Sequence, residues 1–359
     1  MTLPVRFVLA VALCAVGTVA CSADEAAAPA PAPSPPTATT STAREAGVQT
    51  RTPPTTTSTP TPIPTPPPHP VSIEALAQQA YDGRNLQIGE VLDANDAYTR
   101  YFVTYASGDL TISGIMNIPV GAGPFPTLVL AHGYIDPAIY TNGRGMMREQ
   151  DYLARAGYAV LHTDYRNHAE SSDDPNAELE LRLGYTKDVI TAVLAIKASG
   201  HPQLDPERVG LMGRSMGGGV AYNALVASPG LVDAAVVYAP VSSSTADNFN
   251  RWTRADPGAD GVSDAIIAAY GAPEASPEFW QDVSPVTYFD RITEPILIQH
   301  GTADESCPVA WSQQTLAALQ AADADAELIT YDAEPHAFEA VWPLSMERTV
   351  AFFTEHLRA

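Results

Sequence analysis

From residue 71 to the C-terminus, short apolar runs rich in β-branched residues alternate with longer segments whose apolar residues recur at helical spacing. Short apolar runs bounded by turn residues are typical of strands buried on both faces of a sheet. Eight strands are predicted on this basis: Tyr101–Tyr105, Leu110–Ile118, Thr127–Ala131, Tyr158–Thr163, Arg208–Met212, Ala234–Tyr238, Pro295–Gln299 and Glu327–Tyr331.

The helical segments fall between these strands, which is typical of an α/β protein with a mostly parallel, doubly wound sheet. The first two strands are instead expected to pair antiparallel, because each alternates apolar and polar residues and only residues 106–109 separate them. In such a fold, the active-site residues collect on the loops that follow the strands. The main predicted helices are Arg144–Ala156, Tyr185–Ser199, Gly217–Ala227, Ala310–Ala322 and Pro343–Leu357.

The stretch 242–291 interrupts this alternation with roughly fifty residues before the next strand. It is predicted to be a short insertion that forms a lid or a pocket wall. Its aromatic residues Phe249, Trp252, Trp280 and Tyr288 either line an acyl pocket or cover the edge of the sheet, and the sequence leaves both open.

The N-terminus predicts an exported protein. Arg6 precedes an apolar run from Phe7 to Val19 that is too short and too rich in alanine for a transmembrane helix but suits a secretory signal. Residues 1–20 are therefore expected to be removed. Cleavage by an ordinary signal peptidase near Ala20 or Ala23, which would give a secreted protein, is one alternative.

The other alternative, favoured by the cysteines, is a lipoprotein. Residues 18–22 read Thr-Val-Ala-Cys-Ser and resemble a bacterial lipobox, in which the cysteine is lipidated and becomes the mature N-terminus. Cys14 lies inside the signal and Cys307 is alone in the globular part, so the exported domain cannot form an internal disulfide of its own, and Cys21 has no obvious structural role except acylation. We expect a lipid on Cys21 to anchor the protein to a membrane of the bacterial cell envelope.

Residues 21–70 are mostly Ala, Pro, Ser and Thr and contain too few apolar residues to fold, so they predict a disordered tether. Residues 71–359 have the composition of one large catalytic domain. They also carry the whole net charge of −22, because the charges of the first 70 residues cancel. So acidic a surface argues against nucleic acid as a partner.

A Gly-Arg-Ser-Met-Gly motif at residues 213–217 follows the predicted strand Arg208–Met212 and opens a glycine-rich helix. A strand-to-helix turn tight enough to expose the hydroxyl of Ser215 strains its backbone, and only small flanking residues let the chain pass. The N-terminus of the helix favours the negative charge that develops in acyl transfer. Ser215 is therefore the candidate nucleophile.

Two further residues follow strands at the positions that this chemistry requires. Asp304 follows the strand Pro295–Gln299, and His336 follows the strand Glu327–Tyr331. The chain order Ser, Asp, His is that of α/β-hydrolases. We expect His336 to be the general base and then acid, and Asp304 to hold its imidazole and stabilise the imidazolium.

The oxyanion hole needs two donors. The backbone N–H of Met216, directly after the nucleophile, is one candidate. The other is the backbone N–H of Tyr134, which follows the predicted strand Thr127–Ala131, and the phenol of Tyr134 is expected within reach of the same position.

Several residues compete with these assignments. Asp164 also ends a strand but precedes Ser215 in the chain, and Glu305 lies beside Asp304 but is expected to point elsewhere. Cys307 is expected to be a buried, inert thiol, with a redox-sensitive one as the alternative. Packing or hydrogen bonding to a loop is the expectation for the histidines that end strands, His132, His162 and His300, whereas His168 is expected to order the loop after its strand.

The motifs together resemble the α/β-hydrolase superfamily near the prolyl oligopeptidase-like and dienelactone hydrolase-like serine hydrolases. The resemblance covers residues 71–359. It implies hydrolysis of an ester or a peptide bond with no metal and no cofactor, and a triad of Ser215, Asp304 and His336. The segments that carry it are Pro124–Tyr134, Tyr158–Ser171, Gly213–Gly218, Ser284–Asp304 and Pro335–Phe338.

The sequence therefore predicts a serine hydrolase that cleaves small-molecule esters through an acyl-enzyme. Large peptidases of this group carry a β-propeller before the catalytic domain, whereas the tether and a short segment precede it here. A prolyl oligopeptidase-like peptidase is therefore the second hypothesis, and a catalytically silent binding module on the same fold is a remote third.

Overall fold

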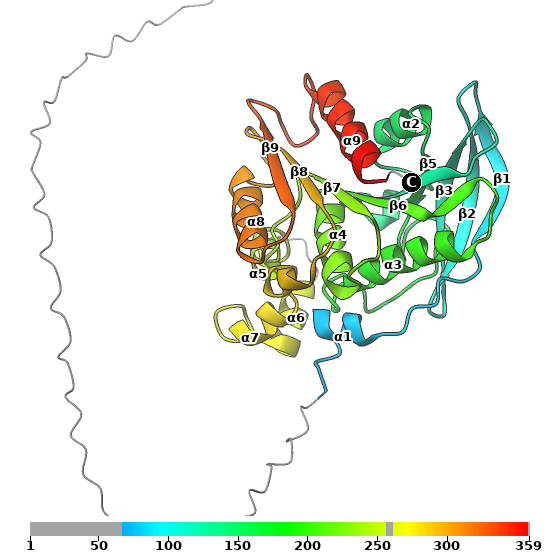
Figure 1. Cartoon of the computed structure of the whole chain (residues 1–359). Coiled ribbons are helices and arrows are strands. Elements are labelled where there is room, and N and C mark those ends of the chain that lie inside the picture. Colours follow the sequence, from blue (N-terminus) through cyan, green and yellow to red (C-terminus); the bar gives the residue numbers. More distant parts are fainter. Residues whose placement is uncertain (1–66, 256–260, 358–359) are drawn as a thin grey trace, which may run out of the picture. The chain divides into compact units, whose positions relative to one another are not determined.

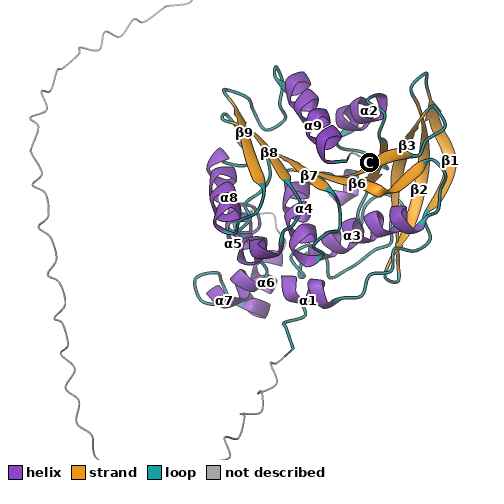
Figure 2. Cartoon of the chain, in the orientation of Figure 1, coloured by secondary structure: helices purple, strands orange, loops and turns teal. Residues whose placement is uncertain are grey.

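The computed structural model describes residues 67–255 and 261–357, and these form one sheet with helices on both faces (Figure 1, Figure 2). The predicted signal peptide and most of the predicted tether lie outside the described residues, so export and lipidation stay predictions. The strands are β1 (Gln87–Ala94), β2 (Tyr98–Ser107), β3 (Leu110–Pro119), β4 (Phe125–Ala131), β5 (Ala159–Thr163), β6 (Leu204–Arg214), β7 (Ala234–Tyr238), β8 (Ile296–Gly301) and β9 (Ala326–Tyr331).

The helices lie mostly between the strands, as expected. The α-helices of the described residues are α1 (Ile73–Gln78), α2 (Met147–Arg155), α3 (Leu183–Ala198), α4 (Met216–Ala227), α5 (Thr245–Asn248), α6 (Val262–Tyr270), α7 (Pro277–Asp282), α8 (Val309–Ala321) and α9 (Trp342–His356). Two 3-10 helices, η1 (Pro137–Ile139) and η3 (Pro285–Arg291), and a π-helix, η2 (Phe249–Thr253), complete the set. In this part of the chain no helix combines the length and apolar character needed to cross a membrane.

The strand order is β1-β2-β3-β5-β4-β6-β7-β8-β9. Neighbouring strands from β5 to β9 pair parallel, whereas β1, β2 and β3 pair antiparallel, and β3 pairs antiparallel with β5. The candidate nucleophile follows β6. This strand lies beside β4, and the chain runs from β4 to β5 on one side of β4 before it returns to β6 on the other side. Ligands bind at such crossover points in open α/β sheets.

The sheet has nine strands where eight were predicted. Each predicted segment overlaps one of β2–β9, and the missed strand is the edge strand β1. Nearly all of its residues are exposed, so the alternation that reveals a half-buried strand is absent. Its pairing with β2 is also irregular, with register shifts between Ile88 and Val91 and between Val91 and Asp93.

Both faces of the central strands are buried. Val129 and Leu211 belong to the core that includes residues of α3 and α4, whereas Leu128 and Met212 belong to the core that includes residues of α2 and α9. Figure 2 shows α2 and α9 on one side of the sheet and α3, α4 and α8 on the other. Because successive side chains enter opposite cores, the central strands read as continuous apolar runs.

The insertion at 242–291 contains α5, η2, α6, α7 and η3. Phe249 and Trp280 are buried with their ring centroids 4.7 Å apart, so these two aromatic residues form part of the core. Trp252 is 39% exposed and contacts Trp311 of α8, with 5.5 Å between ring centroids. Tyr288 is half-buried and lies under the guanidinium of Arg291.

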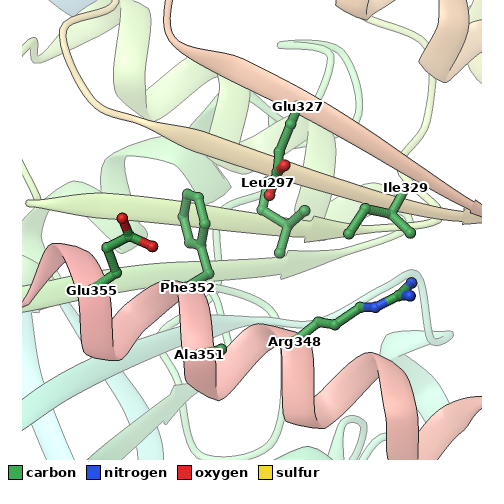
Figure 3. Close-up of a pocket in the computed structure, with 7 residues that line it drawn as sticks. All are labelled: Leu297, Glu327, Ile329, Arg348, Ala351, Phe352 and Glu355. Carbon is green, nitrogen blue, oxygen red and sulfur yellow. The ribbon is translucent and has the colours of Figure 1, made fainter.

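A surface cavity of about 330 Å³ lies between α9 and the strands β8 and β9 (Figure 3). Phe352 projects from α9 toward the strands, and Leu297 and Ile329 lie on the sheet side. None of the residues that line it is a candidate catalytic residue of the sequence. The cavity is therefore separate from the candidate catalytic residues, which follow the carboxyl ends of the strands.

Candidate active site

Ser215 occupies the turn between β6 and α4. Its backbone has φ 55° and ψ −120°, a conformation that is strained for a residue with a side chain. Hydrogen bonds hold this turn in place: the Ser215 N–H donates to the carbonyl of Tyr238, and its own carbonyl accepts from the N–H groups of Gly218 and Val241. The turn therefore depends on β7 and on the loop that follows it.

The two glycines of the motif are sterically required. A Cβ at Gly213 would lie 2.2 Å from the carbonyl oxygen of Gly217, and a Cβ at Gly217 would lie 1.9 Å from the carbonyl oxygen of Ala131. Both contacts are with backbone, which cannot rotate away. The start of α4 therefore packs directly on the end of β4, as the sequence motif predicts for small residues on both sides of Ser215.

Replacing Gly217 by alanine is expected to lower the free energy of unfolding by about 3 kcal/mol, because a methyl group would overlap the backbone of β4. Urea denaturation checks this. Gly219→Ala in the same helix is the matched control, since its Cβ would meet a side-chain methyl group of Val241, at 2.6 Å, and no backbone atom. Equal effects of the two substitutions would contradict the steric explanation.

The loops that carry Asp304 and His336 follow neighbouring parallel strands, β8 and β9. They are joined backbone to backbone: Thr302 N–H donates to the carbonyl of Tyr331, and Ala303 N–H donates to the carbonyl of Glu334. This packing brings the two side chains together. The Nδ1 atom of His336 lies 2.8 Å from Oδ2 of Asp304.

The carboxylate of Asp304 is completely buried and fully bonded. Its Oδ1 accepts from the N–H groups of Ser306 and Cys307, and its Oδ2 lies 3.0 Å from Nε2 of His300 as well as close to His336. Burial raises its pKa, but the hydrogen bonds from His300, His336 and Cys307 outweigh burial and hold the pKa well below its usual range. Asp304 is therefore ionised at neutral pH.

The loop of His336 is also held firmly. Arg148 of α2 donates to the carbonyls of Ala337 (2.7 Å) and Phe338 (3.3 Å). Phe338 is buried against the rings of Tyr238 and Tyr331. The imidazole itself is partly exposed, with 17% of the side chain accessible. His336 is thus fixed through its backbone and Nδ1, while its ring stays open to solvent.

Cys307 links the Asp304 loop to Ser215. Burial raises the pKa of the Cys307 thiol to about 12, and a side-chain hydrogen bond with Ser215 acts against that rise. Within the described residues no hydrogen bond joins Ser215 to His336. Catalytic hydrogen bonds are often long without substrate and shorten when it binds.

Both candidate oxyanion residues lie beside Ser215. Met216 is the first residue of α4, so its N–H is one of the free donors at a helix N-terminus. Gly133 packs on the nucleophile, because a Cβ there would lie 3.1 Å from Cβ of Ser215. Tyr134 comes next, and its side chain is 56% exposed.

The rival acid Asp164 is a structural residue. It is buried and accepts hydrogen bonds from Ser113, Tyr140, Asn142 and the N–H of Gly143, all between 2.6 and 2.8 Å. These bonds tie the loop after β4 to β3 and β5.

The other histidines also fill structural positions. Burial lowers the pKa of His132 to about 3. His168 bonds to the carbonyls of Arg166 and Ile135.

The second rival acid, Glu305, contacts the backbone N–H of His336 at 3.4 Å rather than its ring.

Sequence reasoning expected His300 to pack or to hydrogen-bond to a loop but did not identify Asp304 as its partner, and it missed Arg251. His300 contacts Asp304 directly, and its position at the end of β8, four residues earlier, was the available signal. Arg251 of the insertion donates to the carbonyls of Ser306 (2.6 Å) and Glu305 (3.0 Å). Nothing in the sequence connects Arg251 to this loop, because the contact exists only once the insertion has folded against β8.

A sequence model of the prolyl oligopeptidase family matches residues 145–359, the segment that contains Ser215, Asp304 and His336. The chain belongs to the prolyl oligopeptidase family. Members of this family are serine hydrolases, so the protein is an enzyme of that class. The resemblance predicted from the motifs is thereby confirmed.

Curated relatives of this family member are peptidases. The chain is 25% identical over 265 residues to the uncharacterized peptidase YuxL of Bacillus subtilis, which covers 69% of this chain and 38% of that protein. It is 27% identical over 225 residues to the acylamino-acid-releasing enzyme of Sus scrofa, which covers 60% of this chain and 29% of that enzyme. The chain thus spans about a third of the length of these relatives.

Solved structures show the same fold in this family and beyond it. The acylaminoacyl peptidase of Pyrococcus horikoshii superposes with a TM-score of 0.57 at 20% identity, covering 73% of this chain and 42% of that one. Acetyl xylan esterase 1 from Thermoanaerobacterium also gives 0.57, at 17% identity, covering 75% of this chain and 87% of that one. The α/β-hydrolase fold predicted from the sequence is confirmed.

Proposed function

We propose that the protein hydrolyses carboxylic esters through an acyl-enzyme on Ser215, with His336 and Asp304 as the other members of a catalytic triad. One observation carries the proposal. Ser215 lies on a strained turn at the start of α4, and Asp304 is hydrogen-bonded to His336 at the ends of the neighbouring strands β8 and β9. Nucleophile, base and orienting acid thus follow the carboxyl ends of β6, β9 and β8, with β7 lying between β6 and β8.

The hydrogen bond between His336 and Asp304 assigns the proton of the imidazole. An ionised Asp304 accepts only, so Nδ1 of His336 carries the hydrogen and Nε2 is left with a lone pair. Nε2 then takes the proton of the Ser215 hydroxyl as Oγ attacks the ester carbonyl. The same proton passes to the leaving alcohol when the tetrahedral intermediate collapses, and water repeats the sequence to release the acid.

The N–H groups of Met216 and Tyr134 are proposed to bind the oxyanion of that intermediate. They belong to elements that pack on each other, because Gly217 touches the end of β4 and Gly133 touches Ser215. Preorganised donors of this kind need no rearrangement when charge develops.

Exposed apolar side chains at the carboxyl end of the sheet support a substrate with apolar groups. Large apolar side chains are exposed on segments that follow the carboxyl ends of β4, β5, β7 and β9, the same end at which Ser215 lies. Exposed apolar groups around a site favour apolar ligands. These residues are Tyr134, Ile139, Met147, Leu179, Trp252 and Leu344.

A peptidase that removes N-acylated amino acids is the second candidate. It is supported by the 27% identity to the acylamino-acid-releasing enzyme of Sus scrofa. The ester proposal is supported in turn by the match to acetyl xylan esterase 1, because the match includes 87% of that chain and only 42% of the Pyrococcus peptidase. The same triad serves both reactions, so the choice depends on the leaving group.

Turnover of matched substrates separates the two functions. We expect kcat/KM for p-nitrophenyl esters to exceed that for N-acyl-aminoacyl and dipeptidyl p-nitroanilides by at least roughly a hundredfold, since an amide nitrogen leaves only once it is protonated and an esterase need not align its histidine for that transfer. The full mature chain is assayed beside its Ser215→Ala variant. Anilide hydrolysis as fast as ester hydrolysis, and lost in the variant, would favour the peptidase.

A further inference from the structure

Arg182 is held in an unusual position on the loop between β5 and α3. It precedes the first residue of α3 and has a left-handed backbone (φ 58°), directly after Leu181, which is also left-handed (φ 53°). Two consecutive residues with side chains in this region are energetically costly. The helix itself does not require the arrangement, because the Arg182 side chain makes no capping hydrogen bond to α3.

The guanidinium contacts both candidate oxyanion residues. Its Nη1 lies 3.9 Å from Sδ of Met216, and its Cζ lies 4.7 Å from the ring centroid of Tyr134. The opposite edge is fixed by Glu178, whose Oε1 and Oε2 lie 2.8 and 3.0 Å from Nε. Arg182 thus spans two residues that come from different strand ends, β4 and β6.

Other arginines near this loop have a different environment. Arg166 is buried and saturated by Asp188 and Asp174, so its role is to hold the fold. The side chain of Arg182 is 31% exposed, and its Nη1 edge turns to Met216 beside the nucleophile. A cation so placed stabilises the negative charge of an oxyanion nearby.

We propose that Arg182 is a positioning residue of the oxyanion hole: it fixes Tyr134 and Met216 in place and adds positive charge beside them, and Glu178 orients it. The inference rests on the proposed function, since it assigns a role within the same site. The ring of Tyr134 is exposed, and its contact with the Arg182 guanidinium restricts the rotamers that it can adopt. The contribution is made through these two residues and not by contact with the reacting atoms.

Arg182→Ala is expected to lower kcat for a p-nitrophenyl ester about tenfold to a hundredfold while KM changes less than about threefold, because the oxyanion forms only after substrate has bound. Affinity for a boronic acid that adds to the serine as a tetrahedral adduct is expected to fall by a similar factor. Arg182→Lys keeps the charge and should recover part of the loss, whereas Arg182→Gln should not.

Arg155→Ala is the matched control. Arg155 also pairs through Nε with a carboxylate four residues away, Asp151 (3.0 and 3.1 Å), and lies over a tyrosine ring, Tyr98, at 5.9 Å. It belongs to the last turn of α2, shortly before β5 begins, and so lies toward the amino end of that strand, whereas Ser215 follows the carboxyl end of β6. Its removal should leave kcat and boronic acid affinity unchanged.

Three results would overturn the inference: an unchanged kcat in Arg182→Ala, a loss confined to KM, or an equal loss in Arg182→Lys and Arg182→Gln. If the alanine variant does not fold, the lysine and glutamine variants decide between the same outcomes. Failure of the proposed function looks different, because ester hydrolysis would then persist in Ser215→Ala. Hydrolysis that depends on Ser215 but not on Arg182 refutes only the role of Arg182.

Discussion

Ser215→Ala is expected to lower kcat for ester hydrolysis by at least about 10⁴-fold, with the fold and stability retained. The substitution removes only the hydroxyl, which is the group that attacks the carbonyl. The strained backbone at φ 55° should persist, because hydrogen bonds to Tyr238, Gly218 and Val241 hold it. Steady-state kinetics on p-nitrophenyl esters measures the effect.

Ser199→Ala serves as the control for this substitution. Ser199 caps the end of α3 with a hydrogen bond to the carbonyl of Ile196, at the opposite end of this helix from Arg182. Its replacement should leave kcat unchanged. If Ser215→Ala kept more than about a tenth of the activity, another nucleophile would have to be sought.

Asp304→Asn is expected to lower kcat by about 10⁴-fold at neutral pH. An amide at this position can donate to Nδ1 of His336, which would move the imidazole hydrogen to Nε2 and remove the lone pair that the mechanism needs. Glu305→Gln is the matched control one residue away. Glu305 reaches the backbone of His336 at 3.4 Å and not its ring, so kcat should fall less than about threefold.

The Asp304→Asn substitution is also expected to change how the free energy of unfolding depends on pH. The folded pKa of Asp304 lies below its unfolded value of about 4, so the ionised carboxylate stabilises the fold above pH 4 and loses this contribution as the pH falls below it. The advantage of the wild type over Asp304→Asn in urea denaturation should therefore shrink as the pH falls from 5 toward 2. An advantage that does not change with pH would contradict the charge-based explanation.

Most of the candidate site residues could be predicted from the positions at which the apolar runs end. A strand buried on both faces is visible as a continuous run, and the residue after it lies at the carboxyl edge of a parallel sheet. For that reason Ser215, Asp304 and His336 were found as candidates without knowing the structure. The flanking glycines were informative for the same reason, since a Cβ at Gly217 would overlap the backbone of β4.

The parts that the sequence did not predict depend on contacts between distant segments. The strand β1 has no buried face and therefore no alternation. Arg182 and Arg251 read as ordinary surface arginines, because their importance comes from Met216 and Tyr134 in one case and from the Asp304 loop in the other. The insertion was recognised only because it interrupts the alternation of strands and helices. Its helices are too short for their hydrophobic periodicity to be detected.

The most direct test of the central claim is covalent labelling with a fluorophosphonate, followed by mass spectrometry of the digested protein. A triad that activates Ser215 should give a single phosphonylated peptide with the label on Ser215, and labelling should be abolished in Ser215→Ala and strongly slowed in Asp304→Asn. Folded protein that stays unlabelled at Ser215, or that is labelled equally in Ser215→Ala, would contradict the assignment of Ser215 as the nucleophile.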